Sequence, residues 1–184
     1  MLTENELGKY IDERLTKSAF RLELLDRYDA VSEREDFTRF MRGEPIASLA
    51  QRRPWLDRLR AEAAAGILNQ RVHVVQTPLT DYLRFECEWG YVYNADAGED
   101  ITIIDLAEQD LPAGLTDHDF WLVDDAHAIR MHYNGGGEFV GAEPADSADL
   151  RSYLGAWEAA VAASVPFFDW WNRHTEEWRE HRRG

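Results

Sequence analysis

The densest group of side chains that could do chemistry lies in the stretch TDHDFWLVDDAHAIRMHY, residues 116–133. Its aspartates and histidines are residue types that bind metals or transfer protons as general acids and bases. His118 and Asp119 precede an apolar run, and Asp124 and Asp125 follow it. A strand of about six residues would separate the two pairs by roughly 17–20 Å. Because Asp is also a common turn former, the pattern favours strand ends and a hairpin turn over a metal or acid–base site.

The remaining histidines and the cysteine give no pattern typical of a catalytic or metal site. His73 and His132 stand alone on expected strands, without the spacing of a metal motif. The single cysteine, Cys87, excludes an internal disulfide, and its neighbours Glu86 and Glu88 oppose thiolate formation. We therefore expect no metal, no cofactor and no cysteine nucleophile.

Polar residues are concentrated in TPLTDYLRFE and NADAGED, residues 77–86 and 94–100. Asp81, Arg84 and Glu86 are spaced to form a half-buried ion-pair network, with Tyr82 and Glu99 nearby in the expected fold. Such a network can simply stabilise a helix, or it can line a polar pocket for a small ligand or for a side chain of a partner. The residues leave both interpretations open.

Signals for helices dominate the first 66 residues. Two capping boxes, Thr3 with Glu6 and Ser32 with Glu35, each predict a helix start, because the hydroxyl and the Glu satisfy backbone N–H groups reciprocally. A further helix is expected from Trp55 to Gly66. Residues 20–31 fit either a strand or a helix, since alternating and helical apolar spacings overlap there.

Strand patterns appear after residue 70. RVHVVQT and ITII predict strands, and Thr77-Pro78 predicts a helix start between them. FWLV, AIRMHY and GEFVG predict strands joined by tight turns, and Asp146 or Ser147 should begin a long helix that Pro166 interrupts.

The fold class expected from these elements is mixed α/β: one central mixed sheet flanked by helices, with a long C-terminal helix. We expect a helical N-terminal segment, residues 1–50, packed on an α/β domain, residues 51–184, as one structural unit.

Composition limits the classes of partner. The chain carries 35 Asp and Glu against 20 Lys and Arg, a formal charge of −15, so direct nucleic-acid binding is not expected. An acidic surface complements a basic partner, such as a DNA-binding regulator. Five aromatic residues between Phe167 and Trp178 exceed what one helix face buries, which suggests a partner surface or a homodimer. No signal peptide or membrane-spanning stretch is visible, so we expect a cytoplasmic protein.

Several motifs together resemble a known family. FTRFMRGEP, RVHVVQTPLTDYLRFE, NADAGEDI and DFWLVDD occur in this order over about residues 20–165. They are similar to actinobacterial proteins that share a domain of unknown function, in particular through PLTDYLRFE…AGED…DFWLxDD. Members are often found beside helix-turn-helix regulators, so the resemblance implies a regulatory context and no particular activity.

A fold-level resemblance concerns the degenerate phospholipase D-like sensor modules of some transcription regulators. In active members of that superfamily a strand carries His-x-Lys, with an aspartate after it. Here the corresponding strand would begin Asp119-Phe120-Trp121, with Asp119 in place of His and Trp121 in place of Lys. Asp125 would match the aspartate. A carboxylate and an indole at these positions would repel a phosphodiester, so the resemblance implies that this hydrolysis is absent.

We therefore expect a non-enzymatic regulatory or protein-interaction domain that senses a small ligand or partners a helix-turn-helix regulator. The alternative is a small-molecule hydrolase or other enzyme with a carboxylate and arginine pocket, using Asp81, Arg84, Glu99 and Asp119. A cleft in which these four residues meet would favour the alternative. The candidate ligand- or partner-binding residues are Asp81, Tyr82, Arg84, Glu86, Glu99, Asp119 and Trp121.

Overall fold

One mixed sheet of seven strands forms the centre of the molecule, in the order β6-β5-β4-β1-β2-β3-β7. The structure is a computed structural model, and it describes residues 1–46 and 48–180. The strands are β1 (Ser18–Glu23), β2 (Leu68–Val75), β3 (Glu99–Asp105), β4 (Phe120–Val123), β5 (His127–Tyr133), β6 (Phe139–Pro144) and β7 (Val165–Pro166). β1, β2 and β3 run parallel to one another, and every other neighbouring pair is antiparallel.

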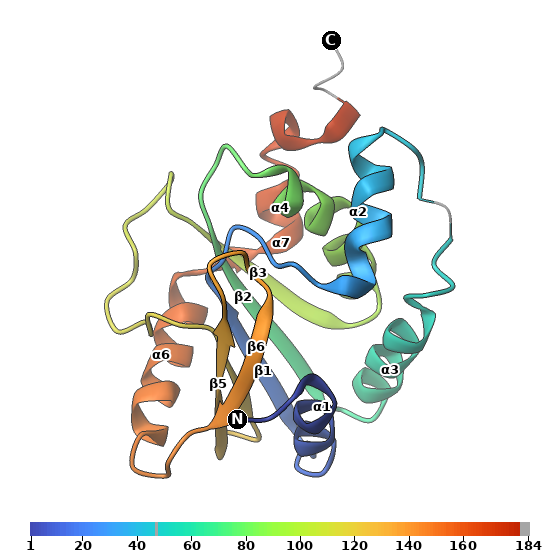
Figure 1. Cartoon of the computed structure of the whole chain (residues 1–184). Coiled ribbons are helices and arrows are strands. Elements are labelled where there is room, and N and C mark those ends of the chain that lie inside the picture. Colours follow the sequence, from blue (N-terminus) through green and yellow to red (C-terminus); the bar gives the residue numbers. More distant parts are fainter. Residues whose placement is uncertain (47, 181–184) are drawn as a thin grey trace.

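Helices cover both faces of this sheet. The α-helices are α1 (Glu4–Asp12), α2 (Arg34–Met41), α3 (Arg53–Ala64), α4 (Asp81–Phe85), α5 (Val92–Asp96), α6 (Leu150–Ala163) and α7 (Phe167–Trp171). A π-helical turn, η2 (Glu86–Tyr91), joins α4 to α5, and two 3₁₀ turns are η1 (Val31–Glu33) and η3 (Thr175–Glu177). Figure 1 shows α6 on one side of the sheet and α1, α2, α3 and α4 on the other. The expected mixed α/β class, with helices around a single sheet, is confirmed.

The segment 1–50, expected to be helical, also contains a central strand of the sheet. β1 pairs with β2 on one side and with β4 on the other, which resolves residues 20–31 as strand followed by irregular chain. The alternation of apolar and charged residues along β1 explains why this segment forms a strand. Phe20 and Leu22 are buried under α6, whereas Arg21 and Glu23 point to the other face.

The two faces of the sheet differ in chemistry. The face under α6 is largely apolar along β1, β2 and β4, with Leu22 and Val72 fully buried, and its polar Gln70 accepts from Trp157 Nε1 of α6 at 3.1 Å. The other face has apolar clusters at its two sides, one under α1 and one under α4, η2 and α7. Between these clusters, β1, β2 and β3 present charged side chains to the interior. Such groups need partners there, because desolvating an unpaired charge is costly.

Helix starts follow the sequence signals only in part. The Thr3 and Glu6 capping box is formed, with Thr3 N donating to Glu6 Oε2 at 2.8 Å. The expected start at Thr77 is wrong: Thr80 caps α4 by accepting from Leu83 N at 3.2 Å, while the Thr77 hydroxyl donates to Asp105.

Two further helix starts differ from expectation. Ser32 lies inside the 3₁₀ turn η1 and does not cap α2, whose first residue is Arg34. Asp146 and Ser147 belong to a turn, closed by Asp149 N donating to Asp146 O at 3.0 Å, so α6 begins only at Leu150. In both cases a local turn uses the polar residues that the pattern assigned to a cap.

The aromatic residues near the C-terminus are largely internal. Phe167, Trp170 and Trp171 are buried, and Trp178 packs against the same cluster, so only Phe168 is markedly exposed, at 43%. The expectation of a surplus aromatic surface therefore reduces to one side chain. No helix among the described residues is long and apolar enough to cross a membrane.

Candidate functional site

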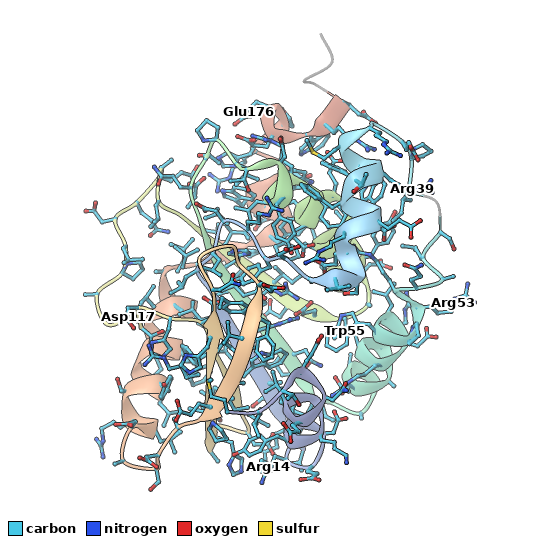
Figure 2. The ribbon with its side chains drawn as sticks, viewed as in Figure 1. Arg14, Arg39, Arg53, Trp55, Asp117 and Glu176 are labelled. Carbon is cyan, nitrogen blue, oxygen red and sulfur yellow. The ribbon has the colours of Figure 1, made fainter. Side chains whose placement is uncertain are left out.

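The candidate site is a network of buried polar side chains on the face of the sheet that α3, α4 and α5 cover. Alternation along the strands places Arg21 and Glu23 of β1 beside Arg71 and His73 of β2, because the register pairs Arg21 with Arg71 and Glu23 with His73. Figure 2 shows the helices and side chains packed over this part of the sheet. Parallel strands therefore bring two charged pairs to the middle of the fold.

Glu99, at the start of β3, joins the two arginines. Its Oε1 lies 2.5 Å from Arg21 Nη2 and 3.1 Å from Arg71 Nε, and its Oε2 accepts from Asn94 Nδ2 at 2.9 Å. The Glu99 side chain is 1% exposed. Burial raises the pKa of Glu99, but the charges of Arg71 and Arg21 outweigh burial and hold the pKa below its ordinary value. Glu99 is thus an ionised, fully bonded carboxylate.

A second group links Glu23 to His73 through Tyr91 of η2. Glu23 Oε2 lies 3.1 Å from Arg71 Nη1 and 3.1 Å from the Tyr91 hydroxyl, which itself lies 2.5 Å from His73 Nδ1. His73 Nε2 lies 3.0 Å from the carbonyl oxygen of Leu25, which can only accept, so this nitrogen carries a proton.

Glu23 and His73, the two titratable ends of this group, differ in charge: Glu23 is ionised and His73 is neutral. Burial raises the pKa of Glu23, yet Arg71 and Arg21 bring it down to about 2. Burial lowers the pKa of His73 from its ordinary value, which favours the neutral ring. A neutral imidazole, a phenol and a carboxylate therefore lie next to one another, and the single proton of the phenol can be donated either to His73 Nδ1 or to Glu23 Oε2.

Asp119 lies at the end of this network, immediately before β4. Its Oδ1 accepts from Leu24 N at 2.9 Å, and its Oδ2 accepts from the Tyr28 hydroxyl. Burial is the main reason that the pKa of Asp119 rises to about 7, and the charge of Glu23 adds to it. Unlike Glu99, Asp119 has no cationic side chain among its hydrogen-bond partners in the described part of the chain, so it can change charge near neutral pH.

Glu86 is a second carboxyl that retains its proton, in the π-helical turn. Burial, together with the charge of Glu33, raises the pKa of Glu86 to about 8. Among the described residues its Oε1 has no hydrogen-bond partner. A Cβ on Gly90 would lie 3.2 Å from Glu86 Oε2 and 3.5 Å from Arg52 Nη1, so the glycine leaves room for this carboxyl and guanidinium. π-Helical turns occur frequently at functional sites.

The remaining candidates lie outside the network. Arg84 binds Asp81 at 2.9 Å and Glu177 at 2.8 Å. The Tyr82 hydroxyl donates to Glu33 at 2.9 Å. The expected pairing of Arg84 with Glu86 does not occur, because Glu86 turns to the other side of the helix, toward Arg52.

Trp121 borders the network and packs its ring against Arg21. The guanidinium of Arg21 lies 4.7 Å from the centre of the Trp121 ring and 5.8 Å from that of Trp55 on α3, labelled in Figure 2. Cation–π contacts of this kind hold the guanidinium in place. Asp119 and Trp121 therefore point to the same face of the sheet as Glu23 and Arg21.

The structure thus brings together only part of the expected set. Glu86, Glu99, Asp119 and Trp121 surround the network, whereas Asp81, Tyr82 and Arg84 lie apart from it. Of the four residues on which the enzyme hypothesis depends, only Asp81 and Arg84 contact each other; Glu99 and Asp119 belong to two further bonded groups. No group of three or more His, Cys, Asp and Glu side chains in the described part of the chain is placed to hold a metal ion.

Sequence reasoning missed the centre of the network, namely Arg21, Glu23, Arg71, His73 and Tyr91. A signal for four of these was present. Both R-x-E in FRLE and R-x-H in RVHV place two charged or titratable residues two apart, with apolar residues at the alternate positions. On a strand with one apolar face under a helix, that pattern puts the charges on one opposite face. Tyr91 gave no such signal, since its position depends on the π-helical turn.

The comparisons with known proteins identify the family. Residues 5–172 match the family model described as Domain of unknown function (DUF6879). No protein with a curated description matches the chain. The matched range runs from α1 to the end of α7 and includes every residue of the polar network. The chain therefore belongs to the DUF6879 family.

Proposed function

We propose that this protein is a cytoplasmic, regulatory protein-interaction domain whose acidic side binds a basic partner. The observation that carries the proposal is the distribution of charge along the chain. Residues 1–66 hold 12 Lys and Arg against 13 Asp and Glu, whereas residues 67–184 hold 8 against 22. Nearly all of the net charge of −15 therefore belongs to the second part.

The excess acids gather around α6. Figures 1 and 2 show α6 and the neighbouring loop with Asp117 on one side of the molecule, and Arg39 and Arg53 of α2 and α3 on the other. We use "acidic side" for the exposed acids of the loop between β3 and β4, the end of β6, its connection to α6, and α6 itself: Glu108, Asp110, Asp117, Glu143, Asp146, Asp149 and Glu158.

Segregated charge of one sign favours a partner of the opposite sign. It speeds association and selects against partners with like charge, and its effect weakens as salt rises. The buried network does not take part in this contact, because its charges are bonded to one another inside the fold. A DNA-binding regulator fits the chemistry, since its surface must be basic to bind phosphates.

The resemblances support a regulatory setting. Actinobacterial relatives that occur beside helix-turn-helix regulators suggest that such a regulator is the partner. We also infer a likeness to degenerate phospholipase D-like sensor modules, in which Asp119 and Trp121 take the places of the catalytic His and Lys. The proposal does not depend on it.

A direct binding titration tests the proposal. The purified chain is titrated into a purified helix-turn-helix regulator with a basic surface, at low and at moderate salt. We expect binding that weakens with salt, and that the triple variant Asp146→Asn, Asp149→Asn, Glu158→Gln weakens at least tenfold. A matched variant on the other side, Glu4→Gln, Glu13→Gln, Glu35→Gln, removes the same number of exposed acids and should bind normally.

Equal losses in the two variants would show that only net charge matters and would contradict an acidic-side contact. Absence of binding to the regulator at low salt would contradict the proposed partner class.

A further inference from the structure

The segment between β1 and η1 lies as a single layer of irregular chain over the ends of the strands. We call residues 24–30 the strap. It is held to the fold by isolated hydrogen bonds: Leu24 N to Asp119 Oδ1 at 2.9 Å, Leu25 O to His73 Nε2 at 3.0 Å, Asp26 O to Thr80 Oγ1 at 2.8 Å, and Asp29 N to Gly137 O at 2.9 Å. The strap therefore covers the carboxyl ends of β1 and β2, where Glu23 and His73 lie.

Space is available on one side of the strap. A hollow of about 410 Å³ lies between strap residues Leu25–Arg27 and the tip of the β5–β6 hairpin, Asn134–Gly137. The tip touches the strap closely, because a Cβ on Gly137 would lie 2.3 Å from Arg27 O. The hairpin tip therefore contacts the strap closely at Arg27, and solvent-accessible space lies beside this contact.

Tyr28 is the side chain by which the strap enters the core. Its ring lies 5.1 Å from that of Tyr133, 6.1 Å from that of His73 and 6.3 Å from that of Tyr82. Its hydroxyl donates to Asp119, which is 4% exposed. The same carboxyl accepts from Leu24 N, so Asp119 fastens the strap at two positions four residues apart.

The surroundings of Asp119 make its charge unfavourable. Burial and the ionised Glu23 of β1 raise the pKa of Asp119, and together they outweigh the hydrogen bonds from the Tyr28 hydroxyl and Leu24 N, which favour its ionised form. Tyr133 of β5 also faces Asp119. His73 of β2 lies beyond Tyr28 and favours its neutral form. The nearest cations, Arg21 and Arg71, are bonded to Glu99 and Glu23. Ionisation of Asp119 therefore places a second buried carboxylate beside Glu23 without a cation of its own.

We propose that the strap is a proton-controlled cover, docked when Asp119 is neutral and released when Asp119 is ionised. Release lets water reach the carboxylate and uncovers the polar group of Glu23, Tyr91 and His73. These groups lie at the carboxyl ends of parallel strands, the place where α/β sheets commonly bind ligands. The inference is independent of the acidic-side contact, because none of the residues involved belongs to that side.

Hydrogen–deuterium exchange of the unmodified chain tests the proposal. After correction for the intrinsic rate, protection of amides in residues 24–30 should be constant below about pH 6 and should fall above about pH 7. One coupled proton changes the opening equilibrium by at most about tenfold per pH unit. Amides of Asn69–Val72 in β2 should keep their protection over the same range, because this strand is paired with β1 on one side and β3 on the other. Constant protection of the strap up to about pH 8 would overturn the proposal.

Two variants assign the effect to Asp119. Asp119→Asn keeps the shape of the side chain without the charge and should remove the pH dependence of strap protection. Asp124→Asn, at the other end of β4, should leave that dependence unchanged. If Asp119→Asn does not fold, Tyr28→Phe replaces it and should lower strap protection already at about pH 6. A fall with pH that persists in Asp119→Asn would show that another group controls the strap.

Discussion

At the scale of single residues, the charge state of a buried ionisable side chain in this fold depends on its hydrogen-bond and ion-pair partners. Glu99 and Asp119 are both buried carboxyls, with relative exposures of 4% each. Two guanidinium groups and an amide bind Glu99, which stays ionised, whereas a backbone N–H and a phenol bind Asp119, whose pKa rises to about 7. Equal burial thus gives opposite charge states, because only a full counter-charge offsets desolvation.

The first prediction concerns Glu99. Glu99→Gln removes the buried carboxylate that lies closest to Arg21 and leaves the guanidinium groups of Arg21 and Arg71 to share Glu23. We expect the free energy of unfolding to fall by roughly 3–5 kcal/mol, the range for breaking a buried pair. Chemical denaturation monitored by tryptophan fluorescence measures it.

A matched control is Asp81→Asn, which also removes a carboxylate from an arginine. The Asp81 side chain is 56% exposed and Arg84 keeps Glu177, so the loss should stay below about 1 kcal/mol. Similar losses in the two variants would contradict the interpretation of Glu99 as the centre of the network.

At the scale of elements, two turns fix how the antiparallel strands meet the rest of the sheet. The β5–β6 hairpin tip contacts the strap through Gly137, which has φ of +81°. The β4–β5 turn contacts the start of β1 through Asp124. Each of these two contacts joins segments that lie about a hundred residues apart in the sequence. They therefore fix how the antiparallel strands pack against the N-terminal part of the chain, and they contribute less to local structure.

Gly137→Ala should destabilise the protein. A Cβ at this position would lie 2.3 Å from the carbonyl oxygen of Arg27, and the positive φ adds strain, so we expect a loss of roughly 1–3 kcal/mol. Gly155→Ala is the matched control, because Gly155 lies inside α6 with no atom within 4 Å of an added Cβ. It should raise stability by about 0.4–1 kcal/mol. Thermal unfolding of both variants checks the opposite signs.

Asp124 and Asp125 provide a second pair within one turn. Both have positive φ, of 51° and 55°. Burial raises the pKa of Asp124, but the hydrogen bonds that it accepts from the Thr16 hydroxyl and from the backbone N–H groups of Ser18, Lys17 and Thr16 lower it below its ordinary value. Asp125 is exposed, and its side chain has no hydrogen-bond partner among the residues that the structure describes.

Asp124→Ala should therefore cost about 1–2 kcal/mol more in unfolding free energy than Asp125→Ala. The two changes share the strain of alanine at positive φ, so their difference isolates the hydrogen bonds to the start of β1. Denaturant titrations give that difference, and equal losses would mean that the bonds contribute nothing.

At the scale of the whole molecule, the buried network makes stability depend on pH. The raised pKa values of Asp119 and Glu86, about 7 and about 8, mean that the folded state keeps protons which the unfolded state releases above about pH 4.5. Their contribution is present at low pH and is lost as pH rises to these values. Glu23, with a pKa of about 2, acts in the other direction: its contribution is lost only as pH falls from about 4.5. His73, with its lowered pKa, opposes part of the alkaline loss below about pH 6.5.

We therefore predict that the free energy of unfolding is highest near pH 5 and falls by roughly 1–3 kcal/mol toward about pH 8. Denaturation at several pH values measures this, and Asp119→Asn should flatten the fall. A stability that rises from about pH 5 to about pH 8 would contradict the charge states assigned to Asp119 and Glu86.

The sequence by itself determined the local elements with strong patterns. The capping box at Thr3, the valine-rich β2 and the alternation of β5 depend on neighbours in the chain, so they could be read without the fold. The sequence also indicated that Asp124 and Asp125 form a turn, since aspartate tolerates positive φ and bonds nearby amides. The single mixed sheet followed from the order of these elements.

Only the tertiary structure decided how the polar residues are grouped. Arg21 meets Glu99 across 78 positions and Asp119 meets Tyr28 across 91, and such pairs depend on strand order, which local patterns do not specify. The π-helical turn then aims Tyr91 and Glu86 inward and leaves Arg84 with Glu177. The physical reason is that a buried charge is stable only beside its partner, and the topology of the sheet alone determines which residues become partners.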